Sequence, residues 1–172
     1  VKNQPSYVAE NLRQLSRLYV VAQKYRNKYG NLLRSKFQYL ENEELERKIM
    51  KHFVEFINIE KDLEKEMKKE LPRHPWSVYL LAIKGVGTVI ASSIIGELNG
   101  AVYGIIEKGR KATKSDLKGY GRSFERTSDL WAYAGYGVKN GKAVKPTHGE
   151  KSNWNKYLKL ACYKFAENQI KQ

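Results

Sequence analysis

The residues best placed to do chemistry are five consecutive ones near the middle of the chain, Lys84-Gly85-Val86-Gly87-Thr88, between two apolar runs. Glycine has no Cβ, so Gly85 and Gly87 permit a sharp turn and let an anion approach the backbone. Amides at the start of a helix lack intrahelical partners and lie at its positive dipole end. The segment therefore predicts a helix-hairpin-helix whose turn binds phosphate. The amides of Gly85, Gly87 and Thr88 would donate, the Thr88 hydroxyl would add a bond, and Lys84 would add charge.

The spacing around this turn supports the same motif. Leu80 and Ile83 close the first helix, and apolar Val86 holds the turn to its own core. Ala91 lets the second helix approach closely, and Ile94 continues its buried face. Such a site contacts the backbone rather than the bases, which predicts non-specific or structure-specific DNA binding. The alternative is an ordinary turn between helices that contains glycines.

Two other basic segments are candidate contacts. The glycine-rich stretch from about 99 to 123 has the length and composition of a loop that orders on a phosphate backbone or stays solvated. Its basic residues are Lys108, Arg110, Lys111, Lys114, Lys118 and Arg122. Asn140-Gly141 predicts a β-hairpin, because both residues tolerate positive φ. Lys139, Lys142 and Lys145 lie along this hairpin, and Lys151 follows it.

Aromatic residues are numerous enough for base stacking, with twelve tyrosines and three tryptophans. Most of them lie on apolar helical stripes, so we expect them first of all in the core. This expectation covers Tyr79, Trp131, Tyr133, Trp154 and Tyr157.

Net charge points to a polyanionic partner. The 172 residues carry 32 Lys and Arg against 18 Asp and Glu, a net charge of +14. Residues 71–172 hold 17 basic and 7 acidic residues, whereas residues 1–70 hold 15 and 11. Nucleic acid is the first candidate partner and an anionic membrane surface the second. The uneven distribution assigns the partner to the C-terminal part.

The elements that must position these residues are mostly helices. Apolar residues at steps of three and four predict helices over about 6–29, ending at Gly30-Asn31, and over about 41–70. These two form either a helical hairpin or a dimerising coiled coil. Pro72 and Pro75 mark a domain boundary. We expect a mainly α fold with a helical arm (1–72) and a helix-hairpin-helix domain (73–172), in which a small β-hairpin precedes a C-terminal helix capped by Asn153.

Catalytic groups are not evident. Cys162 is the single cysteine, so a disulfide within the chain is excluded and a reducing, cytoplasmic (nucleoid-associated) location is expected. Three scattered histidines give no metal-ligand pattern. Glu97 and Asp129 flank the basic loop, but isolated acids are usually surface or capping residues. We expect no cofactor, no metal and no membrane span.

The order of motifs in residues 76–172 resembles a known domain. Ile83-Lys84-Gly85-Val86-Gly87 is followed by a variable insert, then by Arg126-Thr127-Ser128-Asp129-Leu130-Trp131-Ala132-Tyr133-Ala134-Gly135, a Gly-Lys hairpin, the basic turn Lys151-Ser152-Asn153 and a long helix. This resembles the C-terminal domain of DEDD-type insertion-sequence transposases. Members of that family recombine DNA with an RNase-H-like domain and a C-terminal serine, use an RNA guide, and carry a coiled coil before this domain.

Departures from the family pattern limit what the resemblance implies. The sequence contains no RNase-H-like carboxylate domain, and Lys139-Asn140-Gly141 stands where the family has its serine. Ser152 lies at the later turn, so that role is not transferred to it. The expected function is therefore non-catalytic DNA binding, with RNA as a second partner. The alternatives are a recombinase component that acts with a missing catalytic domain and an oligomeric scaffold, for example a homodimer through the N-terminal helices.

Overall fold

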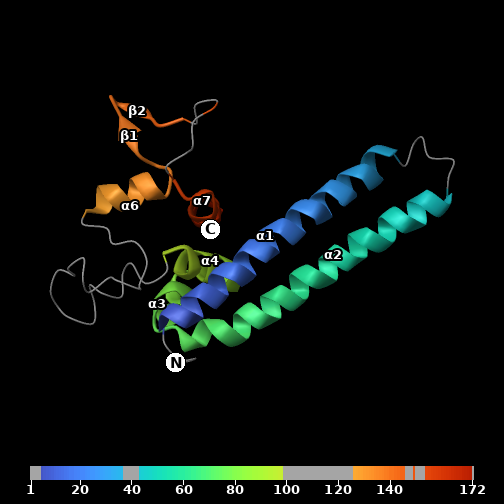
Figure 1. Ribbon diagram of the computed structural model, residues 1–172, viewed down its shortest axis with the longest axis horizontal. Coiled ribbons are helices and arrows are strands. Elements are labelled where there is room, and N and C mark those ends of the chain that lie inside the picture. The colour runs from blue at the N-terminus through green and yellow to red at the C-terminus, as the bar shows by residue number, and fades with distance from the viewer. Residues whose placement is uncertain (1–4, 37–42, 99–125, 146–148, 150–153, 172) are drawn as a thin grey trace.

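A computed structural model describes residues 5–36, 43–98, 126–145, 149 and 154–171. The chain is mainly helical, and the expected order of helical arm, helix-hairpin-helix, β-hairpin and C-terminal helix is confirmed (Figure 1). The elements are α1 (Pro5–Lys36), α2 (Glu43–Glu70), the 3-10 helix η1 (Leu71–Arg73), α3 (Trp76–Ala82), α4 (Thr88–Leu98), α6 (Thr127–Tyr133), β1 (Val138–Lys139), β2 (Lys142–Ala143) and α7 (Lys156–Ile170).

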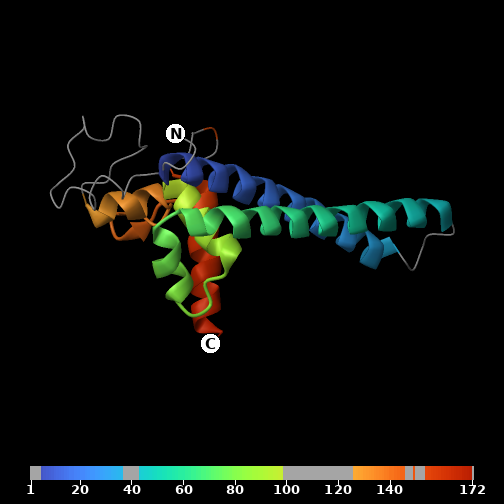
Figure 2. The same cartoon turned by 90° about the horizontal axis from the view of Figure 1, so that it is seen from below.

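Helices α1 and α2 form an antiparallel pair, here called the arm (Figures 1 and 2). Aromatic rings join them in the outer half. The ring centroids of Tyr25 and Phe56 lie 5.4 Å apart, and those of Tyr29 and Phe56 lie 5.6 Å apart. Such offset rings add packing energy beyond their buried area. The arm therefore pairs within one chain, and homodimerisation stays a prediction.

The predicted end of the first helix at Gly30-Asn31 is wrong, because α1 continues to Lys36. Glycine inside a helix costs about 1 kcal/mol relative to alanine. Here that position faces the partner helix: a Cβ on Gly30 would lie 3.1 Å from Phe53 Cε2. Packing of the Phe53 ring against the bare backbone thus overrides the local signal.

The core lies where the base of the arm meets α4. Val8 and Leu12 of α1, Leu71 of η1, and Ile90 and Ala91 of α4 are buried together. This cluster ties the two predicted domains into one packed unit at the arm's base. Figure 2 shows α7 crossing beneath the arm beside α4.

The junction between the arm and α3 contains a buried histidine. His74 is 4% exposed, and its Nδ1 accepts a hydrogen bond from the Trp76 amide at 3.3 Å. Burial lowers the pKa of His74 to about 4, because the charged imidazolium loses its hydration. The His74 side chain is therefore neutral at physiological pH.

Among the described residues, no helix is long and apolar enough to cross a membrane.

The cap of the last helix differs from the expectation. Asn155, rather than Asn153, caps α7: its Oδ1 accepts from the amides of Tyr157 and Leu158 at 3.0 and 3.1 Å. Asparagine is a favoured N-cap residue, so residue type alone does not distinguish position 153 from position 155. Position 155 is selected because its side-chain amide also donates to groups on α4 and α6.

Candidate nucleic-acid interface

The turn between α3 and α4 has the backbone of a tight hairpin. The Ile83 amide donates to Leu80 O at 3.2 Å, and the Val86 amide donates to Ile83 O at 3.0 Å. Gly85 has φ of +83°, a conformation that a side chain would strain. The chain therefore reverses direction within Ile83–Gly87, as the glycine spacing predicts.

The inner side of the turn is anchored in the core. Val86 is 6% exposed and belongs to the core cluster with Ile90, and Ala91 is fully buried. Both positions thus match the roles predicted from their spacing. Ile94 is partly buried, whereas Ile83 is 38% exposed, so Ile83 caps α3 instead of closing its apolar face.

The outer side of the turn is open to solvent. A Cβ on Gly87 would meet nothing within 4 Å, and Lys84 is exposed. The described residues supply no hydrogen-bond acceptor for the amides of Gly87 and Thr88. These donors lie at the amino end of α4, the positive end of its dipole. An anion can therefore approach the backbone closely at this point.

The end of α7 holds the turn from behind. Asn168 Nδ2 donates to Gly85 O at 3.0 Å, and Gln169 Nε2 donates to Lys84 O at 2.7 Å. Both turn carbonyls are thereby satisfied by α7. Sequence reasoning missed these two residues, because nothing in the local pattern links them to a turn more than eighty positions earlier.

Large apolar side chains are exposed on α3 and at the end of α7. Tyr79 is 72% exposed and Ile170 is 86% exposed. The expectation that Tyr79 lies in the core is wrong, because α3 faces the core with Trp76 and Leu80 and turns Tyr79 away. Within the turn itself, residues 83–87, the one basic residue is Lys84.

The predicted β-hairpin forms at Asn140-Gly141. Both residues have positive φ, 53° and 72°, and Val138 pairs with Ala143. Lys142 and Lys145 are exposed, and Lys139 lies in β1 opposite Lys142. Outside the described residues lie the other predicted contacts, Lys108, Arg110, Lys111, Lys114, Lys118, Arg122 and Lys151.

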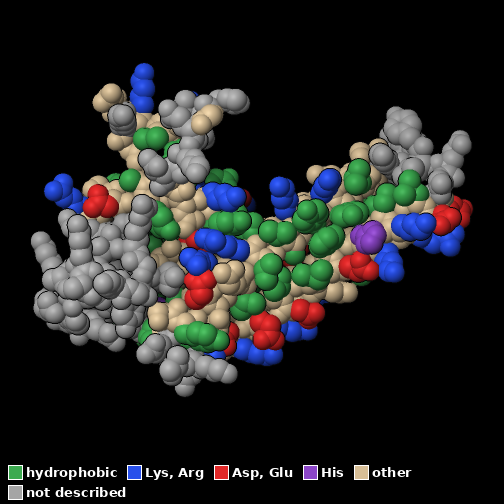
Figure 3. All heavy atoms as spheres, viewed as in Figure 1, with side chains coloured by type: hydrophobic (Ala, Val, Ile, Leu, Met, Phe, Trp, Pro, Cys, Tyr) green, Lys and Arg blue, Asp and Glu red, His purple; other side chains and the backbone are tan. Residues whose placement is uncertain are grey.

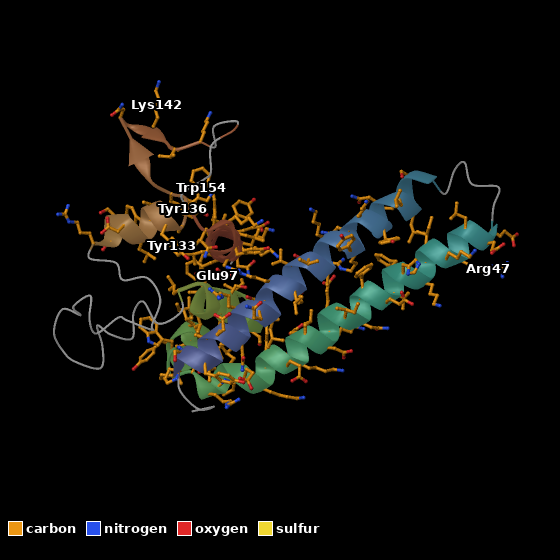
Figure 4. All side chains as sticks on the ribbon, viewed as in Figure 1. Arg47, Glu97, Tyr133, Tyr136, Lys142 and Trp154 are labelled. Carbon is orange, nitrogen blue, oxygen red and sulfur yellow. The ribbon has the colours of Figure 1, made fainter. Side chains whose placement is uncertain are left out.

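Glu97 joins four helices through one buried carboxylate. Its Oε1 accepts from Arg17 Nε at 2.6 Å, and its Oε2 accepts from Arg17 Nη2 at 2.8 Å and from Asn155 Nδ2 at 2.6 Å. Asn155 Nδ2 also donates to Tyr133 Oη at 2.9 Å. This hydrogen bonding raises the pKa of Arg17, although burial opposes the rise. Figure 4 labels Glu97 and Tyr133 near the end of α6.

This network makes Glu97 a structural residue. Among the described residues, no three His, Cys, Asp or Glu side chains are grouped so that they could hold a metal ion. Asp129 accepts from the Arg126 amide at 3.2 Å at the start of α6, as its position in the first turn predicts.

Comparisons with models of protein families, with curated proteins and with solved structures give no match to this chain.

Proposed function

We propose that this protein binds the phosphate backbone of DNA at the turn between α3 and α4. One observation carries the proposal: the turn is fixed from within by buried Val86, while its outer side at Gly87 is open and lined by amides. Fixed donors at a helix start bind anions without reorganising. Backbone contact of this kind gives little sequence preference.

The distribution of charge supports the same site. Basic residues on α2 are largely paired with acids one turn away, for example Lys48 with Glu44 and Lys68 with Glu64. Figure 3 shows acidic and basic side chains beside one another along the edge and at the outer end of the arm. The surplus of positive charge belongs instead to the C-terminal part, which contains the turn. The resemblance to a family that recombines DNA also supports DNA as the partner.

Replacement of Gly87 by valine tests the proposal. We expect affinity for duplex DNA to fall about tenfold or more, because side-chain bulk would keep a phosphate from the turn amides and forfeit charge-assisted hydrogen bonds. The fold should persist, since a Cβ at this position meets no neighbour. Fluorescence anisotropy with labelled duplex measures the affinity, and thermal unfolding checks the fold.

A matched variant separates this effect from added surface bulk. Ala166→Val adds apolar volume at an exposed position of α7, so it should bind duplex as tightly as wild type does. Wild-type affinity in a folded Gly87→Val protein would refute the turn as the contact site.

A further inference from the structure

Two aromatic side chains on and just after α6 are exposed, and one of them, Trp131, is a residue that the sequence predicts to lie in the core. Trp131 on α6 is 60% exposed, and Tyr136, three residues after α6, is 43% exposed. Helix α6 directs Tyr133 toward Asn155 instead, which turns Trp131 outward. The expectation of a buried Trp131 is therefore wrong, and its indole is available to a partner.

Tyr136 is held in place beside a second ring. Its hydroxyl donates to Lys159 O at 3.0 Å. The Lys159 ammonium lies 5.7 Å from the Tyr136 ring centroid and 5.1 Å from that of Trp154. Gly135, with φ of +79°, allows this approach: a Cβ there would lie 2.9 Å from Lys159 Cδ and 3.1 Å from Trp154. The rings and the cation are thus preorganised, and Figure 4 shows Tyr136 and Trp154 close to each other.

Exposed basic residues lie on the elements that carry or adjoin these rings. Lys142 and Lys145 are exposed on and beside the β-hairpin, and Arg126 is exposed before α6. Asp129 is the one acidic residue among described residues 126–145 and 154–159, and it is bonded to the Arg126 amide. Among the described residues, this region therefore combines aromatic side chains with an excess of basic over acidic residues, the composition that binds single-stranded nucleic acid.

We propose that this surface binds unpaired nucleotides, whose bases stack on the rings while the lysines contact phosphates. We call it the stacking surface; it comprises Trp131, Tyr136, Trp154, Lys142, Lys145 and Lys159. The inference rests on the proposed function and extends it by naming the form of the partner. Every base has an aromatic face, so stacking tolerates any sequence.

Helix α7 links the stacking surface to the turn. Asn155 caps its start and Lys159, one turn later, lies over the Tyr136 and Trp154 rings, whereas Asn168 near its end donates to Gly85 O. At 1.5 Å per residue, Asn155 and Asn168 are about 20 Å apart along the helix. A nucleic acid with duplex at the turn and an unpaired strand at the stacking surface would engage both. The preferred partner is thus a duplex with a single-stranded extension.

Binding of single strands, blunt duplex and overhang duplex by ring variants tests this inference. We expect Trp131→Leu to weaken single-strand and overhang binding about fivefold or more, because one stacked base is lost, while blunt-duplex affinity stays within about twofold. Tyr136→Leu should show the same pattern of losses as Trp131→Leu. Tyr136→Phe keeps the aromatic ring, so its affinity for single strands should match that of the wild-type protein. Tyr7→Leu, equally exposed at 43% on α1, is the control.

The outcomes separate this inference from the proposed function. Equal losses on all three substrates, or none in either ring-deleted variant, would overturn the stacking surface. If Gly87→Val still weakens duplex binding in that case, the proposed function stands without it. A wild-type protein that binds no substrate would overturn both.

Discussion

Replacing Arg17 with methionine is expected to lower the free energy of unfolding by about 3–5 kcal/mol, because it strands a buried carboxylate. The Glu97 side chain is 1% exposed, and both its oxygens accept from the Arg17 guanidinium. Methionine fills a similar volume but donates nothing. Urea unfolding followed by circular dichroism measures the loss.

The partner variant Glu97→Gln should cost less. The Arg17 side chain is 35% exposed, so its charge can still reach water when the carboxylate is removed. Equal or reversed losses in the two variants would show that burial of Glu97 does not govern the energy of this pair.

Replacing Gly96 with alanine is expected to destabilise the fold by about 2 kcal/mol despite alanine's higher helix propensity. A Cβ there would lie 2.5 Å from Arg13 N and 2.6 Å from Arg13 Cα. These are backbone atoms of α1 that cannot move aside, so α1 and α4 must separate. The separation would open the core around Ala9 and Ala91. Thermal unfolding measures the loss.

The matched control is Gly30→Ala in the outer arm. Its Cβ would meet only the Phe53 ring, at 3.1 Å, and that side chain can shift. The gain in helix propensity should offset this, leaving stability within about 1 kcal/mol of wild type. A Gly96→Ala protein as stable as Gly30→Ala would contradict the close crossing of α1 and α4.

Local signals predicted the elements that short-range physics determines. The Gly85–Gly87 spacing located the turn and Asn140-Gly141 located the β-hairpin, because positive φ restricts the residue type at such positions. Apolar periodicity located the two long helices of the arm. The prediction that Val86 lies in the core is confirmed. An apolar side chain in an otherwise solvent-exposed turn is stabilised when it packs against the core.

Long-range packing decided what the sequence could not show. Gly30 lies inside a helix because Phe53 covers it, and Asn155 is the cap because Glu97 is within its reach. Trp131 is a large aromatic residue, and the sequence predicts that it lies in the core. However, α6 is only seven residues long, and none of its residues is buried. Asn168 supports the turn from the far end of the chain.

The Glu97 network connects the two proposed contact surfaces. Asn155 ties the start of α7 and Tyr133 of α6 to α4, the helix whose amino end forms the turn. The stacking surface and the turn thus share one rigid support. The stability variants above should therefore be compared at temperatures where each remains folded before any effect on binding is assigned.

The most direct test of phosphate binding is the salt dependence of duplex affinity in the wild-type protein. Each contacted phosphate lowers log K by about 0.9 per unit of log salt concentration. About two phosphate contacts, at the turn amides and at Lys84, predict a slope of about −2 or steeper. Affinity independent of salt, or no binding to duplex, single-stranded or branched DNA or structured RNA at low salt, would contradict the account.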